Sequence, residues 1–289
     1  MISLIICSRK SDIPYELKEN INTTIGVKYE LVIIDNSKNE YTIFQAYNLG
    51  VTRAKYPYLC FMHEDILFHT DGWGKKVLIH FENKIIGLIG VVGGHYLPDC
   101  PASWWSTECK SGQFAFGYSD PINKHAVEVF KWLRNKSVDE KSTNVVTVDG
   151  LWFCIPRKLF DLISFDDSTF SGFHCYDTDI CMQINELGLD VRVIFDILIE
   201  HTSWGNQDEN FIAQRELCYR KWSHKLPMIR GIQLTEYEII DRCELVKEIN
   251  KEHDMFISSQ NEIKKIRSSK AYRLGKFILK PFSILRSLK

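Results

Sequence analysis

Short apolar runs alternate with segments of helical periodicity through the first third of the chain. Residues 2–7, 29–34 and 58–62 are apolar nearly throughout, as strands buried on both faces are. Between these runs, residues 14–22 and 43–54 carry apolar side chains at helical spacing. This β-α-β-α-β order predicts an α/β fold with a mainly parallel sheet, right-handed crossovers and flanking helices.

The same alternation continues to about residue 205, with one interruption at residues 95–125. That segment carries Trp104, Trp105 and other aromatic residues among polar ones, and we expect a long aromatic loop. Such loops are often functional, although a local aromatic core is an equally good interpretation. The other expected elements are helices at 73–81, 157–163 and 176–187, and strands at 85–92, 145–148, 190–195 and 198–201.

The last part of the chain is mostly helical from residue 207 onward and suggests a separate extension. We expect one domain at 1–225 and a helical extension at 226–289. Six positions from Val246 to Ile263 recur at steps of three and four, but two of them, His253 and Gln260, are polar. The pattern gives weak support to a coiled coil and leaves a homodimer open. After Glu262 the chain has basic and apolar residues but no acids, a pattern that suits an anionic membrane surface. A helix docked on its own domain is the alternative.

Composition narrows the class of protein. Of the 289 residues 45% are hydrophobic and 25% charged, with a formal net charge of -1 and basic residues concentrated only at the end. This balance argues against nucleic-acid binding. The nine cysteines form no Cys-x-x-Cys pair, and no apolar run reaches 18 residues. We therefore expect reduced thiols and a cytoplasmic protein, either free or peripheral on the inner face of the plasma membrane.

Polar residues follow each of the first three predicted strands. Ser8 follows the first, Asp35 and Asn36 follow the second, and His63-Glu64-Asp65 follows the third. Open α/β folds bind ligands at this carboxyl edge of the sheet. The chain has neither Gly-x-Gly-x-x-Gly after its first strand nor Gly-x-x-x-x-Gly-Lys, so glycine loops do not explain phosphate binding. A divalent cation held at Asp65 is a means of holding a diphosphate.

A second polar stretch lies further on. Tyr176-Asp177-Thr178-Asp179 opens a predicted helix, and His201 ends a short predicted strand. Asp177 and Asp179 have two interpretations: a catalytic carboxylate, or an acid that caps the N-terminus of the helix. One residue can serve both purposes. His201 is either a metal ligand or a core histidine.

The order of these motifs resembles the family 2 glycosyltransferases with the GT-A fold. The sequence is most similar to a rhamnosyltransferase-like branch whose metal motif is His-x-Asp, and the resemblance covers about residues 2–205. It implies a Rossmann-like GT-A domain that transfers sugar from a nucleotide-diphosphate donor. Two departures stand out: His63 replaces the first acid of the usual metal motif, and Tyr176 stands where many members carry Glu.

The resemblance also implies roles for single residues. The metal, Mn²⁺ or Mg²⁺, would be bound by His63, Asp65 and His201, and Asp177 would be the catalytic base, with Asp179 beside it. The aromatic residues Trp104, Trp105, Trp152 and Tyr176 are candidates to contact the acceptor. The candidates for binding a UDP- or dTDP-sugar are Ser8, Asp35, Asn36, Asn48, Gly50, Glu64 and Asp65.

The resemblance and these residues favour an inverting, metal-assisted glycosyltransferase of hexosyl or rhamnosyl type. It would act on a saccharide or lipid-linked saccharide in surface polysaccharide synthesis. In such a reaction the cation stabilises the departing diphosphate, and a carboxylate takes the proton of the attacking hydroxyl. Two alternatives stay open: an inactive nucleotide-sugar-binding module, because of His63, and a sugar nucleotidyltransferase.

Overall fold

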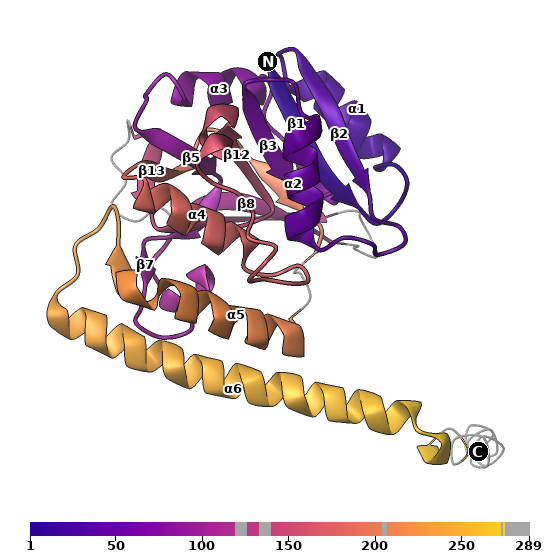
Figure 1. The fold of residues 1–289 in the computed structure, drawn as a ribbon, viewed down its shortest axis with the longest axis vertical. Helices are drawn as coiled ribbons and strands as arrows, with labels where there is room; N and C mark the ends of the chain where they lie inside the picture. Colours follow the sequence, from indigo (N-terminus) through magenta and orange to yellow (C-terminus); the bar gives the residue numbers. More distant parts are fainter. Residues whose placement is uncertain (119–125, 133–139, 204–206, 273, 275–289) are drawn as a thin grey trace.

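The computed structural model describes residues 1–118, 126–132, 140–203, 207–272 and 274. Figure 1 shows a mixed α/β body with a long helix, α6, along one side. A seven-stranded sheet in the order β10-β13-β5-β12-β3-β1-β2 forms the centre. Its strands are β1 (Ile2–Ser8), β2 (Tyr29–Asp35), β3 (Tyr58–Met62), β5 (Ile86–Gly90), β10 (Ser142–Val145), β12 (Trp152–Pro156) and β13 (Asp190–Ile194).

The predicted parallel block is present. β1 pairs in parallel with both β2 and β3, and Ser8 is the register partner of Asp35. β12 runs antiparallel to both β3 and β5, while β13 runs parallel to β5, so β2, β1, β3, β5 and β13 all point the same way. Their carboxyl ends therefore lie along one edge of the sheet, which is the edge where α/β folds bind ligands.

Helices cover both faces of this sheet, and the central strand β1 is apolar on both of its sides. Neighbouring positions of β1 alternate between two cores: Leu4 packs in the core with α1 (Tyr15–Thr24) and α3 (Trp73–His80), and Ile5 packs in the other. The second core includes residues of α2 (Ile43–Arg53), α4 (Tyr176–Glu186) and α5 (Glu209–Trp222). Burial on both faces explains why the strand sequences are continuous apolar runs rather than alternating ones.

The second sheet corrects the expectation of a long loop at 95–125. Its strands follow the order β11-β6-β8-β14-β4, and β9 pairs with β8. In place of a loop, β8 forms an antiparallel hairpin with β9, and Phe114 stacks on Phe130 and Trp132 across it. Aromatic cross-strand pairs of this kind stabilise a sheet, and they exist only once the two strands meet. The strands are β4 (Ile66–Phe68), β6 (Val92–Gly94), β8 (Lys110–Tyr118), β9 (Ala126–Trp132), β11 (Thr147–Val148) and β14 (Ile199–His201).

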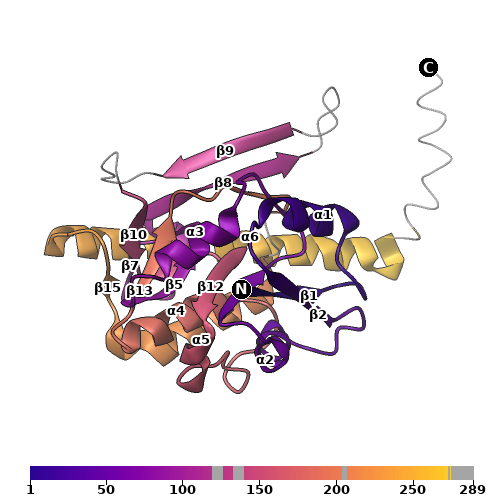
Figure 2. The ribbon, with the colours of Figure 1, turned by 90° about the horizontal axis from the view of Figure 1, so that it is seen from above.

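Two expected strands are each divided between the sheets. The run at 85–92 becomes β5 and β6, and the run at 145–148 is shared by β10 and β11. The helix expected at 157–163 is the 3-10 helix η2 (Arg157–Asp161). Figure 2 shows the β8–β9 hairpin lying over the helices and strands of the central body. The remaining short elements are β7 (Tyr96–Leu97), η1 (Trp104–Thr107), η3 (Ser223–Lys225) and β15 (Met228–Ile229).

The long helix α6 (Glu236–Ser268) lies against the body through η1 and α5. Val246 and Ile257 are buried there, and Arg215 of α5 forms an ion pair with Asp254 at 2.7 Å. Among the described residues, no helix is both long and apolar enough to cross a membrane. Most of the basic tail expected to meet a membrane lies beyond residue 274, outside the described part of the chain.

The expectation that all nine cysteines are reduced thiols is wrong for one pair. Cys60 of β3 and Cys154 of β12 are register partners in the antiparallel pair, and a disulfide joins them. The other seven cysteines are free thiols, as expected from the sequence.

Candidate functional site

Three side chains converge where β3 and β14 end. Asp65 Oδ1 lies 3.3 Å from His201 Nε2 and 3.9 Å from His63 Nδ1. The two histidine nitrogens are 3.3 Å apart. Two ligands bound to one ion at about 2.0–2.2 Å are separated by roughly this distance. The sequence prediction that His63, Asp65 and His201 come together is therefore matched by the geometry, and the three ligand atoms fit a single cation.

Hydrogen bonding determines which nitrogen of His63 faces this cluster. The Tyr176 hydroxyl donates to the Gly150 carbonyl at 3.1 Å, so it accepts the hydrogen bond from His63 Nε2 at 2.8 Å. His63 Nδ1 then keeps its lone pair and faces Asp65 and His201. A partner on the far nitrogen is the usual way in which proteins orient a metal-binding histidine.

The ionisation of the cluster also suits a cation. Burial and the neighbouring His201 hold the pKa of His63 below its usual value, which favours the neutral ligand form. Burial alone would raise the pKa of Asp65, but the hydrogen bond from His201, and the positive charges that His201 and His63 carry when protonated, hold it well below its usual range. The site thus offers two imidazoles and a carboxylate, a donor set that suits Mn²⁺ better than Mg²⁺.

Asp177 lies at the start of α4 and is partly buried. Burial, and then the charge of Asp149, raise the pKa of Asp177 to about 7. Its Oδ1 accepts a hydrogen bond from the Thr178 amide at 2.7 Å, which holds the carboxylate in place. A carboxylate with a pKa near neutrality can take a proton from a hydroxyl group at physiological pH.

Asp149 is a site residue for which the sequence analysis assigned no role. It follows β11, and its carboxylate accepts hydrogen bonds from Trp104 Nε1 at 3.0 Å and from the Leu151 amide at 2.8 Å. Its charge acts on both Asp177 and His63. The sequence contains a pattern that could have identified Asp149, because this residue directly follows an apolar run, as Asp35 does.

The structure gives Asp179 a different role from the catalytic one expected. Its side chain is only 1% exposed. It accepts hydrogen bonds from Trp222 Nε1 and Gln183 Nε2, both at 2.8 Å, and pairs with Lys221 at 2.7 Å. Side chains two residues apart on a helix point in directions about 160° apart, so only one of Asp177 and Asp179 can face the site. Asp179 instead joins α4 to α5.

Three of the residues expected to bind the nucleotide lie together at the carboxyl edge. Glu64 accepts a hydrogen bond from Ser8 Oγ at 2.5 Å and pairs with Arg9 at 2.7 Å, which connects the ends of β3 and β1. Asp35 ends β2 beside Ser8 and is exposed. The pKa of Asp35 is held below its usual value by hydrogen bonds from Ser37, so its carboxylate is charged and accessible.

Apart from Asp65 in the His-Asp-His cluster, the remaining three residues expected to bind the nucleotide have structural roles. Asn48 makes two hydrogen bonds with the Phe165 backbone, and a Cβ added at Gly50 would meet Ile5 at 2.3 Å. Gly50 is therefore needed for close packing of α2 on β1. Asn36 is buried and bonds to both backbone groups of Tyr41, which closes the turn after β2.

The aromatic residues expected to contact the acceptor are mostly buried. Trp152 is 0% exposed and packs edge-on against Trp73, so it cannot stack on a sugar in this structure. Tyr176 is turned toward His63, and Trp104 toward Asp149. Trp105 is partly exposed and contacts His253 of α6, so it keeps a face that a ligand can reach.

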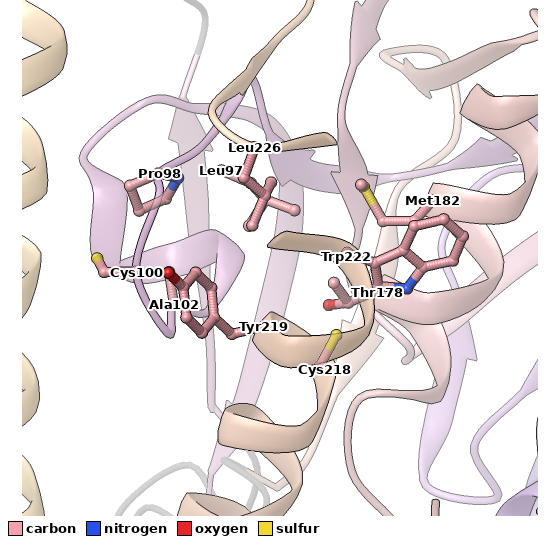
Figure 3. A pocket seen from close by; sticks show the side chains of 10 residues that line it. All are labelled: Leu97, Pro98, Cys100, Ala102, Thr178, Met182, Cys218, Tyr219, Trp222 and Leu226. Carbon is pink, nitrogen blue, oxygen red and sulfur yellow. The ribbon is translucent and has the colours of Figure 1, made fainter. Parts of the chain in front are cut away.

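Two hollows in the structure lie outside the cluster of His63, Asp65 and Asp177. A cavity of about 20 Å³ lies between α4, α5 and the segment after β7. Figure 3 shows the side chains that line it, which include Thr178, Cys218 and Trp222. This volume holds about one water molecule and no substrate. A hollow of about 690 Å³ lies at the opposite edge of the sheet, between Pro57, Phe81 and Arg157. Neither hollow includes His63, Asp65 or Asp177.

A mainly parallel sheet with a His-Asp-His cluster and an aspartate of raised pKa near its carboxyl edge defines an α/β protein of the GT-A class. The sequence comparison agrees with this class. A profile of a glycosyltransferase-like family matches residues 3–225, and the chain belongs to this family. No curated protein sequence matches the chain.

Similarity to one solved structure supports the fold. The chain is similar to GalNAc-T7, solved with UDP, GalNAc and Mn²⁺, at a TM-score of 0.50 and 13% identity, over 77% of this chain and 47% of that one. It thus spans about half the length of that protein. A second similarity is to A197 from STIV, at a TM-score of 0.40 and 10% identity, over 70% of this chain and 85% of that one.

Proposed function

We propose that this protein transfers a sugar from a nucleotide-diphosphate donor to a hydroxyl group of a saccharide or lipid-linked saccharide. The observation that carries the proposal is the grouping of His63, Asp65 and His201 within 4.8 Å at the carboxyl edge of the sheet. Asp177, with a pKa of about 7, is a base suited to the acceptor. Family membership supports sugar transfer in general.

In this proposal Asp177 takes the proton of the acceptor hydroxyl as that oxygen attacks the anomeric carbon. The bond from that carbon to the diphosphate oxygen breaks in the same step, and the single displacement inverts the anomeric configuration. Burial and the charge of Asp149 keep the pKa of Asp177 near 7, so the base is present at neutral pH and still basic enough to accept a proton.

His63, Asp65 and His201 would hold a divalent cation, with Tyr176 orienting His63. When bound, such a cation stabilises the charge that develops on the departing diphosphate. The similarity to GalNAc-T7, solved with UDP and Mn²⁺, supports Mn²⁺ and a UDP-sugar as the first choices, with Mg²⁺ and dTDP-sugars next. Asp35, beside Ser8, is the residue we assign to the ribose or base of the nucleotide.

The finer assignments rest on the resemblance in the sequence. A rhamnosyl or hexosyl donor, a role in surface polysaccharide synthesis and a cytoplasmic location at the inner membrane face belong to this proposal. Trp105 is the aromatic residue that best suits acceptor contact, because it keeps an accessible face and follows Trp104, which contacts Asp149.

The test is hydrolysis and transfer with a panel of UDP- and dTDP-sugars in Mn²⁺, Mg²⁺ or EDTA. We expect one donor to be turned over, with EDTA and Asp65→Ala each reducing the rate at least about 100-fold. Asp177→Asn should slow turnover while donor binding, measured by calorimetry, is retained. Asp35→Asn should instead weaken donor binding.

Two results would contradict the proposal. Tight binding of a donor without turnover, in the presence of a mixed acceptor panel, would favour the inactive binding module. Release of pyrophosphate from a nucleoside triphosphate and a sugar phosphate would favour the nucleotidyltransferase.

A further inference from the structure

The β8–β9 hairpin borders the candidate metal cluster. His201 ends β14 and is the register partner of Phe116 on β8, and Phe116 is in turn the register partner of Glu128 on β9. Neighbouring strands lie about 4.8 Å apart, so the backbone of Phe116 is one strand spacing from His201 and that of Glu128 is two spacings away. The hairpin therefore continues the sheet that holds one of the three cluster residues.

The side chains of His201, Phe116 and Glu128 point to the same face of this sheet, because register partners share a face and neighbours along a strand alternate. The contacts agree with this assignment. Phe114 and Phe130, the next pair along the hairpin, stack with their ring centroids 5.4 Å apart. Glu200 precedes His201 and points the other way, where its Oε2 lies 2.8 Å from His69 Nε2.

This face changes from core to open surface along the hairpin. Phe114 is 8% exposed and lies in the same core as Ile199 of β14. Phe116, level with His201, packs against the rim of that core and is partly exposed. Glu128 is exposed. The open end of the face thus presents an aromatic ring and a carboxylate beside the metal cluster.

An aromatic ring beside a carboxylate suits a saccharide. The ring can pack against the C–H groups of a sugar ring, and the carboxylate can accept hydrogen bonds from sugar hydroxyl groups. The negative charge of Glu128 would repel a diphosphate. The hairpin therefore suits an uncharged sugar better than the phosphates of the donor.

The position of the hairpin also favours the acceptor. Asp35, which we assign to the nucleotide, lies on β2 of the central sheet and is separated from β3 by β1. Phe116 approaches the cluster from the other sheet, through β14. Strand β8 contacts η1, and Trp105 of η1 packs against the same core as Phe116. The hairpin thus lies with the aromatic residue already proposed for the acceptor.

We propose that Phe116 and Glu128 bind the saccharide acceptor and determine which sugars are accepted. Phe116 packs against the sugar ring, and Glu128 accepts hydrogen bonds from its hydroxyl groups. This inference rests on the proposed sugar transfer and adds two specificity-determining residues to it.

The first test uses methyl glycosides of hexoses, deoxyhexoses and N-acetylhexosamines as acceptors, with the donor that the wild type turns over. We expect Phe116→Leu and Glu128→Gln each to raise the acceptor KM at least about 10-fold, because each removes a contact with the acceptor. The donor KM, and donor hydrolysis without acceptor, should stay within about 2-fold of the wild type. Phe116→Leu keeps an apolar side chain at the rim of the core, and circular dichroism would verify that both variants are folded.

Lys131→Gln and Val127→Ala are the matched controls. Both residues are exposed positions of β9, and both alternate with Glu128, so their side chains point to the opposite face. Neither change should alter the acceptor KM. An unchanged acceptor KM in either Phe116→Leu or Glu128→Gln would overturn the proposal, as would an equal loss of donor hydrolysis.

A binding measurement separates this proposal from the proposed activity. If no donor is turned over, sugar transfer fails, but saturation-transfer NMR with the same methyl glycosides still tests the hairpin. Saturation transfer to a glycoside in the wild type and Lys131→Gln, with a clear reduction in Glu128→Gln, would support the hairpin as a saccharide site. No transfer in the wild type, or equal transfer in Glu128→Gln, would overturn it.

Discussion

At the scale of single residues, the candidate site depends on hydrogen bonds that select one tautomer of His63. Tyr176 accepts the hydrogen bond from His63 Nε2, which directs Nδ1 toward Asp65 and His201. Gly150 makes this possible, because a Cβ there would lie 2.1 Å from the Tyr176 hydroxyl. The resemblance placed Tyr176 where many relatives carry an acid, and in this structure its hydroxyl orients His63.

We expect Tyr176→Phe to weaken Mn²⁺ binding about 10- to 100-fold, because His63 loses the partner that orients it. Calorimetric titration with Mn²⁺ measures this directly. Tyr96→Phe removes another tyrosine hydrogen bond, to the Ile239 carbonyl, and should leave Mn²⁺ affinity unchanged. Equal affinities in the wild type and both variants would show that Tyr176 does not orient His63.

Asp177 gives a prediction for pH. Because its pKa is raised to about 7, the carboxyl group is protonated in acid and the base is absent there. The rate of transfer should therefore increase as pH rises through about 7 and level off above it. Asp177→Asn should reduce the rate about 10²- to 10⁴-fold and abolish this dependence.

Asp149→Asn separates the two causes of the raised pKa. Removing the charge of Asp149 should move the midpoint of the pH–rate profile to lower pH, because only burial then raises the pKa of Asp177. The profile is measured with the same donor and acceptor as for the wild type. An unchanged midpoint would show that the charge of Asp149 does not act on the base.

The same shift has a consequence for stability. A carboxyl group with a raised pKa in the folded state binds its proton more tightly there, so stability from this group is lost as pH rises from about 4 to about 7. Asp177→Asn should therefore be more stable than the wild type above about pH 7, by about 1–3 kcal/mol, with little difference at about pH 4. Denaturant unfolding at both pH values measures the difference.

At the scale of elements, helix α4 carries two aspartates with different roles: Asp177 is the proposed base, and Asp179 is a structural residue. Asp177 lies near Asp149 and the Gly150 backbone, while Asp179 is buried among Trp222, Gln183 and Lys221 and holds α5 in place. Lys221 also pairs with Asp166 at 2.8 Å, so α5 is connected to two segments. The contacts of Asp179 with α5 therefore hold α4 in place, and α4 in turn positions the proposed base Asp177.

Asp179→Ala should lower the free energy of unfolding by about 2–4 kcal/mol, because it leaves buried donors without an acceptor. Thermal and denaturant unfolding test this. Asp167→Ala, at an exposed position nearby, should change stability by less than about 0.5 kcal/mol. A variant at Asp179 that is fully stable but inactive would restore the catalytic role that the structure argues against.

At the scale of the whole molecule, α6 is attached to the body by one face, and its outward side carries exposed apolar and acidic residues together. The Arg215–Asp254 ion pair and the burial of Val246 join it to α5 and η1. The division into a domain at 1–225 and an extension at 226–289 stays a prediction.

The sequence by itself determined the alternation of strands and helices at the start of the chain and the polar residues that follow each strand. The spacing of apolar residues and the turn residues between them are local properties, so they can be read without a structure. They predicted β1, β2 and β3, the carboxyl edge of the sheet and the placement of His63 and Asp65 at that edge.

Only the tertiary structure decided which polar residues share a site and which hold the fold together. Asp179, Asn48 and Trp152 each resemble site residues in the sequence, but their partners come from segments distant in the chain. The strand β8 likewise needs β9 to pair with it. Asp149 acquires its influence on Asp177 because β11 and α4 meet in space, and no local pattern encodes that meeting.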